Sequence, residues 1–268
     1  MDAQAGRIRL LSYNVQVGIP TRKYHHYITH SWKHLLPFPE RQNNLDRIAE
    51  FISNFDIVGL QELDAGSIRS SFVHQPEYVA KKAGFPYCYH RVNRDLGIVA
   101  QHSLAILSRC EAHCIVEHKL PSTIPGRGAL EAHFGDPNDP LVVILAHLSL
   151  SARSRKRQLD YLAKLVNGYR HAVVMGDLNT EAHSEEIRGL LDSTALSPPR
   201  VVSKTYPSWK PRVAYDHIFV TPEIKIGESE VYGVRHSDHL PVSIEVDVPD
   251  NNFSLEYCKT EPTDKRLN

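Results

Sequence analysis

The sequence predicts an α/β protein in which β-sheets are covered by helices. Short runs rich in Val, Ile and Leu are bounded by Gly, Pro, Asn or Asp, as buried strands are. Two amphipathic segments each lead into such a run, which favours helices packed on sheets. The 268 residues are 41% hydrophobic and 23% charged, the composition of an ordinary globular protein, which excludes a disordered or collagen-like chain.

Seven apolar runs are expected to form strands: residues 8–15, 56–61, 103–107, 141–147, 172–175, 213–220 and 241–246. Residues 40–54 are expected to form a helix, because Leu45, Ile48 and Ile52 recur at helical spacing. Residues 154–167 show the same spacing through Leu159 and Leu162. Sheets with outer helices are therefore predicted along the whole chain.

Neither a repeat nor a low-complexity linker divides the chain, so we expect a single domain over residues 1–250 and a polar tail over 251–268. The beginning of the chain lacks the basic and apolar pattern of a signal peptide. The four Cys lack the paired spacing of a structural zinc site. These features favour a cytoplasmic protein. Lys plus Arg and Asp plus Glu both number 31, so no global field attracts a polyanion.

One long segment, residues 18–40, interrupts the alternation of strands and helices. It is basic and aromatic, has no acidic residue before Glu40, and ends in an apolar stretch from Trp32 to Phe38. Loops of this length inside a compact domain are usually functional or disordered. A lid packed on the body and a substrate-recognition element are both open interpretations.

Polar side chains recur where the predicted strands begin or end, and buried positions of this kind are costly unless the groups are paired or metal-bound. Glu62 and Asp238 supply the hard oxygen ligands that Mg²⁺ or Mn²⁺ prefers. Histidines supply acid–base groups near neutral pH, and asparagines supply neutral donors. The set suits metal-assisted phosphoester hydrolysis. It comprises Asn14, Glu62, His147, Asp177, Asn179, Asp216, Asp238 and His239.

Other hydrolase classes lack their signatures. The chain has no Gly-x-Ser-x-Gly elbow of a serine hydrolase and no His-Glu-x-x-His motif of a zincin. Taken in order, the motifs around Asn14, Gln61-Glu62, His147, Gly176-Asp177-Leu178-Asn179, Asp216 and Ser237-Asp238-His239 resemble the endonuclease/exonuclease/phosphatase superfamily, over residues 8–247. That superfamily includes pancreatic deoxyribonuclease, abasic-site endonucleases, neutral sphingomyelinases and inositol polyphosphate 5-phosphatases.

The resemblance implies a four-layer α/β sandwich: two mixed β-sheets packed face to face, helices outside, and the site at one edge. By matching motif positions, it implies that Glu62 ligates an essential Mg²⁺ or Mn²⁺, with Asn14 and Asp238 close to the ion. It implies that Asp177 polarises the attacking water and that Asn179 stabilises the pentavalent phosphorus.

The resemblance also implies roles for two histidines. His239 would contact the scissile phosphate or share the base role, oriented by Asp216. His147 would act on the leaving group or a phosphate oxygen. Gln16 stands where abasic-site endonucleases have an acid, which removes one candidate metal ligand and resembles the pancreatic deoxyribonuclease branch.

Five further residues are candidates for substrate contact. Arg69 follows the Glu62 strand, and Arg153 and Arg155 belong to the densest basic stretch. Tyr206 and Trp209 precede Asp216 and are expected near the same edge, either packed under the site or stacked on a base. Solvated charges and structural packing are the competing interpretations.

The reaction class is better defined than the substrate. A nuclease acting on DNA or RNA is the first hypothesis, because basic and aromatic groups supply phosphate and stacking contacts. A phosphodiesterase acting on a lipid head group is the second, with residues 32–38 as the membrane-facing element. An inositol-phosphate phosphatase or another phosphomonoesterase is the third. A non-catalytic binding module is disfavoured, because every motif position holds a competent residue. We expect a monomer without an obligate protein partner.

Overall fold

The computed structural model describes residues 7–20, 38, 40–122, 126–199 and 203–248. Its first sheet has six strands in the order β10-β11-β1-β2-β4-β3, and its second has five in the order β5-β6-β7-β8-β9. The first contains β1 (Ile8–Asn14), β2 (Ile57–Asp64), β3 (Tyr87–Asp95), β4 (Gln101–Ser108), β10 (Lys225–Val231) and β11 (Val242–Asp247). The second contains β5 (Cys114–Lys119), β6 (Gly128–Phe134), β7 (Leu141–His147), β8 (His171–Asp177) and β9 (Asp216–Val220).

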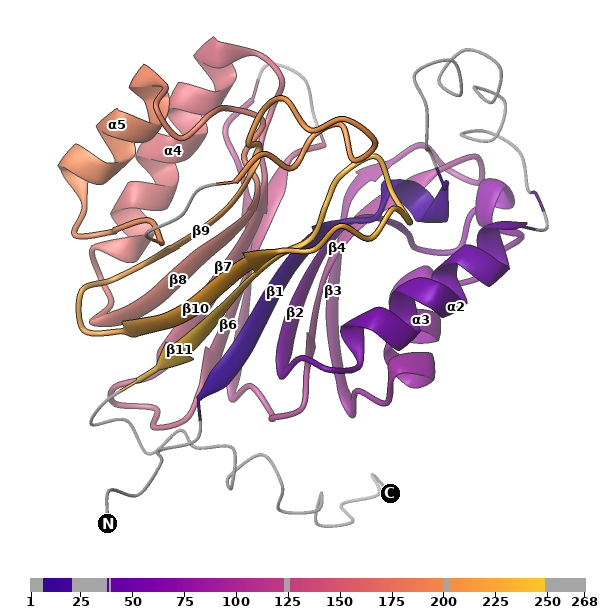
Figure 1. Ribbon diagram of the computed structural model, residues 1–268, viewed down its shortest axis with the longest axis horizontal. Coiled ribbons are helices and arrows are strands. Elements are labelled where there is room, and N and C mark those ends of the chain that lie inside the picture. The colour runs from indigo at the N-terminus through magenta and orange to yellow at the C-terminus, as the bar shows by residue number, and fades with distance from the viewer. Residues whose placement is uncertain (1–6, 21–37, 39, 123–125, 200–202, 249–268) are drawn as a thin grey trace.

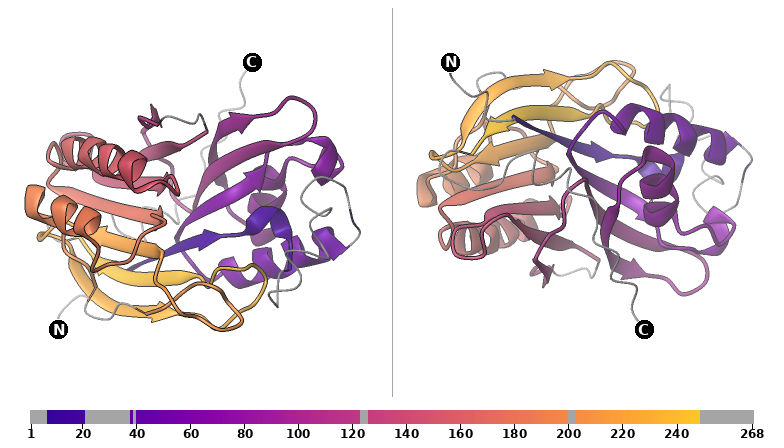
Figure 2. Two further views of the ribbon diagram at one scale, coloured as in Figure 1. Left: turned by 90° about the horizontal axis from the view of Figure 1, so that it is seen from above. Right: turned by 90° about the horizontal axis from the view of Figure 1, so that it is seen from below.

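The two sheets lie face to face between two layers of helices (Figures 1 and 2). Helices α2 (Glu40–Ile52) and α3 (Gln75–Ala83) cover the first sheet, and α4 (Ala152–Val166) and α5 (Glu185–Ser193) cover the second. Each helix buries one apolar face; α2 buries Leu45, Ile48 and Ile52. This is the four-layer α/β sandwich that the sequence predicts.

Side chains from both sheets interdigitate in the central core. Leu10 of β1 and Ile106 of β4 share one buried cluster with Leu145 of β7 and Met175 of β8. Gly59 of β2 lies at the closest approach, because a Cβ there would come within 2.6 Å of both Leu145 and Met175. The alternating apolar residues of the strands therefore hold the sheets at a fixed separation.

Strand direction brings the chemically important residues to one edge of the sandwich. β1 and β2 are parallel, and so are β7 and β8, so their carboxyl ends share an edge within each sheet. β9 is antiparallel to β8 and therefore begins at that edge. Loops that leave this edge connect to α3 and α4, whereas the opposite edge carries none of the polar motifs.

All seven predicted strands and both predicted helices are present, with small shifts at their ends. β9 begins at Asp216 instead of residue 213, because Val213 is hydrogen bonded to Tyr206 in a preceding turn. Among the described residues, six α-helices and strands were not predicted: α3, α5, β3, β5, β6 and β10. Three of those strands, β3, β5 and β10, lie at sheet edges and are only partly buried, so they lack the apolar runs that identify the central strands.

Most of the segment 18–40 and the tail 251–268 fall outside the described residues, so the expectations for a lid, for residues 32–37 and for the tail are not addressed by the structure. Phe38 is described: it is buried, and its ring packs against the Arg41 guanidinium at 4.5 Å. Among the helices of the described residues, none is long and apolar enough to cross a membrane.

Candidate active site

The first sheet contributes an asparagine and a glutamate. Asn14 is the last residue of β1, and Glu62 lies on β2 where the register with β4 shifts between Gln61 and Leu63. Glu62 has a φ of 59°, a left-handed conformation that is rare for a non-glycine residue. Because the register shifts here, the Glu62 side chain does not follow the alternation of the other side chains of the strand. It is 29% exposed, whereas its neighbours are buried.

The second sheet aligns three more residues across adjacent strands. His147 of β7 pairs in register with Asp177 of β8, and Asp177 pairs with Asp216 of β9. Gly176 has a φ of 142°, and a Cβ at this position would collide with the carbonyl oxygen of Ala146. Only glycine therefore fits before Asp177, which explains the first residue of the Gly-Asp-Leu-Asn motif.

The loop before β11 supplies Asp238 and His239. The Ser237 hydroxyl donates to Asp238 Oδ1 at 3.1 Å and accepts from the His239 backbone N–H at 3.4 Å. Ser208 fixes the same loop from outside, because its N–H donates to the Asp238 carbonyl and its hydroxyl to the Ser237 carbonyl, both at 2.7 Å. Both candidate residues are thereby held by a hydrogen-bonded turn.

A network of side chains joins the two sheets. Asn14 Nδ2 donates to Asp177 Oδ2 at 3.0 Å and lies 3.3 Å from Glu62 Oε1. His147 Nε2 is 3.6 Å from Asp177 Oδ2 and 3.8 Å from Glu62 Oε1. His239 Nε2 lies 3.7 Å from the same Asp177 oxygen. Asp177 is thus the centre at which the groups converge.

Asn179 and Asp216 orient the groups around Asp177. The Asn179 backbone N–H donates to Asp177 Oδ1 at 3.0 Å, and its Nδ2 donates to the Leu148 carbonyl at 2.9 Å. Asp216 Oδ2 lies 2.8 Å from His239 Nδ1. Because the buried Asp216 carboxylate is an acceptor, Nδ1 carries the proton of this pair, and Nε2 faces Asp177.

Two carboxyl groups have raised pKa values. Burial raises the pKa of Asp177 to about 7, with His239 opposing the change and Asp216 adding to it. Burial and the nearby Asp238 carboxylate raise the pKa of Glu62. Crowded buried carboxylates that lack enough positive charge are typical of sites that bind cations or transfer protons.

The two histidines are shifted in opposite directions. Burial lowers the pKa of His239, but the carboxylates of Asp216, Asp177 and Asp238 outweigh it and raise the pKa well above the normal value. Burial and the positive charge of Arg127 hold the pKa of His147 well below normal. The site therefore presents one cationic and one neutral imidazole on either side of Asp177.

The donor set fits a divalent metal ion. Glu62 is the most exposed of the central carboxylates, and Asp238 raises its pKa, as expected when two carboxylates approach without a cation. Asn14 turns its amide Nδ2 toward Glu62, while its Oδ1 accepts the Gln16 backbone N–H at 3.1 Å. Asp177, Asp216 and His239 also place ligand atoms within 4.8 Å of one another, but there Asp216 is already committed to His239. Glu62 and Asp238, beside the Asn14 amide, are therefore the better candidates for binding a divalent cation.

The predicted arginine contacts occupy different environments. Arg69 is 2% exposed and forms a buried ion pair with Asp64, so its charge balances a carboxylate inside the protein. Arg155 is bonded to Glu186 at 2.9 Å and to the Leu150 carbonyl at 2.5 Å, which anchors the start of α4. Arg153 is exposed at the same helix end. Of the three, Arg153 alone faces solvent.

The predicted aromatic pair lies beside the site. The Tyr206 ring is 4.8 Å from the His239 ring and 5.6 Å from that of Tyr215. Trp209, in the same loop, is half-buried. Tyr206 therefore packs against His239, the arrangement that the packing interpretation predicts.

Sequence reasoning missed a cationic group next to the site. A cavity of about 370 Å³ is lined by Glu62 and His147 together with Asn93, Arg94, His102 and Arg127. The Glu62 and Asp177 carboxylates raise the pKa of Arg127, although burial lowers it overall. Arg127 stands between two glycines directly before β6, and this Gly-Arg-Gly signal was readable in the sequence.

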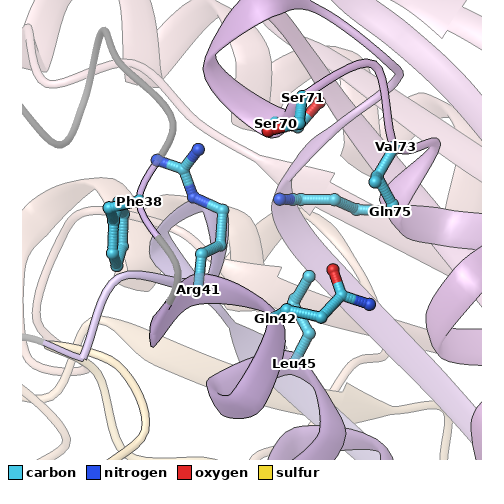
Figure 3. Close-up of a pocket in the computed structure, with 8 residues that line it drawn as sticks. All are labelled: Phe38, Arg41, Gln42, Leu45, Ser70, Ser71, Val73 and Gln75. Carbon is cyan, nitrogen blue, oxygen red and sulfur yellow. The ribbon is translucent and has the colours of Figure 1, made fainter.

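A second cavity, of about 280 Å³, lies apart from these groups (Figure 3). The Arg41 guanidinium lies between Phe38 and Ser70, with Gln75 and Leu45 on the neighbouring wall. Gln75 is tied to the Val17 carbonyl and the Asp64 N–H. Since none of the catalytic candidates lines it, this cavity is separate from the site.

Comparison with solved structures supports the fold. An endonuclease/exonuclease/phosphatase family protein from Bacteroides thetaiotaomicron is 18% identical, with a TM-score of 0.70 over 91% of this chain and 98% of its own. A mannosyl-6-phosphatase from Bacteroides thetaiotaomicron VPI-5482 is 18% identical, with a TM-score of 0.66 over 90% and 99%. The human Nocturnin catalytic domain with a bound sulfate anion is 16% identical, with a TM-score of 0.65 over 92% and 95%.

The sequence itself decides the family. No curated protein matches this chain at a significant level. The model of the Endonuclease/Exonuclease/phosphatase family matches residues 11–239, which include every one of the motifs at the strand ends. The chain belongs to the endonuclease/exonuclease/phosphatase family.

Proposed function

We propose that this protein is a divalent-metal-dependent phosphodiester hydrolase, with a nucleic acid as its first candidate substrate. Its family consists of enzymes that hydrolyse phosphoesters. The observation that carries the proposal is the placement of Asp177, whose Oδ2 lies 3.0 Å from Asn14 Nδ2, 3.6 Å from His147 and 3.7 Å from His239. A buried carboxylate in this setting is suited to take a proton from a water molecule.

The surrounding side chains support one division of labour. Asp177 accepts the proton of the attacking water, and Asn179 holds Asp177 in place and offers an amide to the phosphorane. His239, kept cationic by Asp216, donates from Nε2 to a phosphate oxygen. His147, kept neutral, lies on the Glu62 side, where its N–H can donate a hydrogen bond to the leaving oxygen, which takes its proton from solvent water. A metal ion held by Glu62, Asp238 and Asn14 would neutralise charge on the phosphate.

Cationic and aromatic groups near the site support a nucleic acid. Arg94 and Arg127 line the cavity beside Glu62, and Arg153 is exposed at the start of α4. Guanidinium groups bind phosphates, and Trp209 is a candidate stacking surface. The proposal includes a monomeric enzyme without an obligate protein partner.

The test is hydrolysis by purified protein with Mg²⁺ or Mn²⁺, with DNA, RNA, phospholipid vesicles and inositol phosphates side by side. We expect cleavage of DNA or RNA that requires metal and is lost in Glu62→Gln, which removes one ligand charge at nearly constant size. Activity that persists in Glu62→Gln at limiting metal would contradict the metal assignment. Intact nucleic acids together with head-group release would move the substrate to a lipid.

One observation favours a lipid phosphodiesterase as the second candidate. Phe72, Ile98 and Leu150 are 68%, 69% and 75% exposed, and each lies in a loop at the same edge as Asp177. Leu96 and Val99 flank Ile98 in the β3–β4 hairpin and are exposed as well. Exposed apolar side chains grouped around a site are typical of a surface that contacts protein or lipid. Vesicle co-sedimentation of Ile98→Ser beside the wild type tests this alternative.

A further inference from the structure

The cavity beside Glu62 and His147 has two arginines in its lining, of which only Arg127 is held by the carboxylates of the site. Arg94 and Arg127 line it from β3 and from the residue before β6, and neither forms an ion pair with another described residue. Each arginine disfavours the charged form of its neighbours: Arg94 lowers the pKa of Arg127, and both lower that of His102. Arg94 is exposed and Arg127 faces the Glu62 and Asp177 carboxylates, so the exposed Arg94 guanidinium is available to an anion that enters the cavity.

Gly126 and Gly128 leave room for the side chains of Arg94 and Asn93 in the wall of the cavity. A Cβ on Gly126 would come within 2.8 Å of Arg94 Cβ and 2.9 Å of Arg94 Cδ, so only a glycine leaves room for the arginine stem. A Cβ on Gly128 would collide with Asn93 Oδ1, a buried oxygen that has no donor among the described residues. The Gly-Arg-Gly segment therefore seats the end of β3 against the cavity.

His102 supplies a neutral donor on the same wall. Arg69 Nη1 lies 3.2 Å from His102 Nε2, and because a guanidinium can only donate, Nε2 is the acceptor and Nδ1 carries the proton. Burial and the adjacent Arg69 charge lower the pKa of His102 to about 4, so the ring stays neutral at physiological pH. Its Nδ1–H finds no acceptor among the described residues. Ser151 and Ser154, at the start of α4, complete the lining.

We propose that this cavity is a subsite for a second phosphate group of the substrate, held by Arg94 and His102 beside a scissile phosphate that contacts Arg127. The inference rests on the proposed phosphoester hydrolysis, which places the scissile group near Glu62. The second phosphate has two sources of the same chemistry: the next phosphodiester of an oligonucleotide, or a terminal phosphomonoester on a small substrate. A phosphate anion matches a guanidinium group and a neutral donor better than a sugar or an apolar chain does.

The first test is binding, measured by calorimetry with Mg²⁺ in the Asp177→Asn background so that ligand is not consumed. Thymidine 3′,5′-bisphosphate should bind about tenfold or more tightly than either thymidine monophosphate, as expected for one added charge-assisted contact. Arg94→Gln should abolish that preference, and Arg94→Lys should restore part of it. Arg157→Gln, an exposed arginine of α4 outside the cavity lining, is the matched control and should keep the preference. Equal affinities in the parent protein would overturn the subsite.

The second test identifies the source of the phosphate and separates the two proposals. It compares kcat/KM for the dinucleotide TpT, for pTpT and for TpTpT. These substrates share one type of scissile bond and differ in the neighbouring phosphate. A gain for pTpT alone indicates a terminal phosphomonoester, and a gain for both indicates the next phosphodiester; Arg94→Gln should reduce either gain. Cleavage at equal efficiency for all three contradicts the subsite and leaves the hydrolase proposal standing. If the bisphosphate binds more tightly than the monophosphates but none of the three oligonucleotides is cleaved, the subsite stands and the proposed nuclease activity is contradicted.

Discussion

Two buried clusters of carboxylate and histidine in the second sheet differ in how completely they are hydrogen bonded. In one, Glu131 of β6 lies 3.0 Å from His118 and 2.6 Å from His133, and accepts from the Tyr169 hydroxyl at 2.8 Å. In the other, the histidines beside Asp177 remain 3.6 and 3.7 Å away. The first cluster has donors at hydrogen-bonding distance, whereas the second keeps both histidines outside it.

The difference in contacts appears as a difference in pKa. Burial raises the pKa of Glu131, but the donors from His118, His133 and Tyr169 outweigh it and lower the pKa to about 2. Burial raises the pKa of Asp177 to about 7. The Glu131 carboxylate is held charged by its donors, whereas the raised pKa of Asp177 lets this group take up and release a proton near neutral pH. Burial alone therefore does not separate the two carboxylates, because Glu131 and Asp177 are both buried and their pKa values shift in opposite directions.

The largest expected effect is on catalysis by Asp177→Asn. We expect turnover to fall by about 10²-fold or more, the scale of a lost acid–base group. The midpoint of thermal unfolding should stay unchanged or rise, because the substitution removes a carboxylate whose raised pKa reflects a cost of burial. Steady-state kinetics and thermal unfolding of the same preparation measure both. Wild-type turnover in a pure sample would remove Asp177 from the mechanism.

Glu131→Gln should have the opposite profile. The substitution removes a charge that two histidines and a tyrosine hold, so we expect a loss of up to about 3 kcal/mol in the free energy of unfolding, from the shift of 4.5 to about 2 in pKa. Turnover per folded molecule should remain at the wild-type level, since Glu131 lies outside the site. Urea unfolding measures the expected loss of stability, and steady-state kinetics measure the expected unchanged turnover. If the variant lost activity while it kept its stability, the contrast between the clusters would fail.

The stability that Glu131 contributes has a defined pH dependence. The folded-state pKa of Glu131 is below the unfolded value, so its contribution to stability is complete above about pH 4.5 and is lost as the pH falls toward 2. The stability gap between wild type and Glu131→Gln should therefore narrow between those two values and stay constant at neutral pH. Urea titrations at a series of pH values measure the gap. A gap that is independent of pH would assign the loss to packing instead of charge.

Part of this contrast was predictable from the sequence. The central strands are continuous apolar runs, so β1, β7 and β8 were located, together with the polar residues at their ends. The structure brings those residues to one edge because parallel strands share the direction of their carboxyl ends. Gly176 also has a readable cause, since the chain passes the Ala146 carbonyl too closely for any side chain.

Other features depend on contacts between residues far apart in the chain. The Glu131 cluster joins His118, His133 and Tyr169 through strand pairing and the turn between α4 and β8, and no local sequence motif predicts it. β3 is an edge strand with a polar face, so its Arg94 was not connected with the site. A charge-dense stretch in the sequence likewise does not reveal which of its arginines are already paired.

Arg155 gives the smallest expected effect and sharpens this last point. Its side chain is 13% exposed and that of its partner Glu186 is 17% exposed. The exposure of this ion pair is therefore intermediate between that of the buried Glu131 cluster and that of a solvated surface charge. We expect Arg155→Gln to lower the free energy of unfolding by about 1 kcal/mol, the upper range for partly exposed pairs. If Arg155 serves the start of α4, KM for the hydrolysed phosphodiester should change less than about twofold, whereas loss of a direct phosphate contact would raise KM about tenfold. Arg153→Gln, from the exposed neighbour on the same helix end, is the matched comparison, and a larger rise in KM for Arg155→Gln than for Arg153→Gln would return Arg155 to the substrate-binding surface.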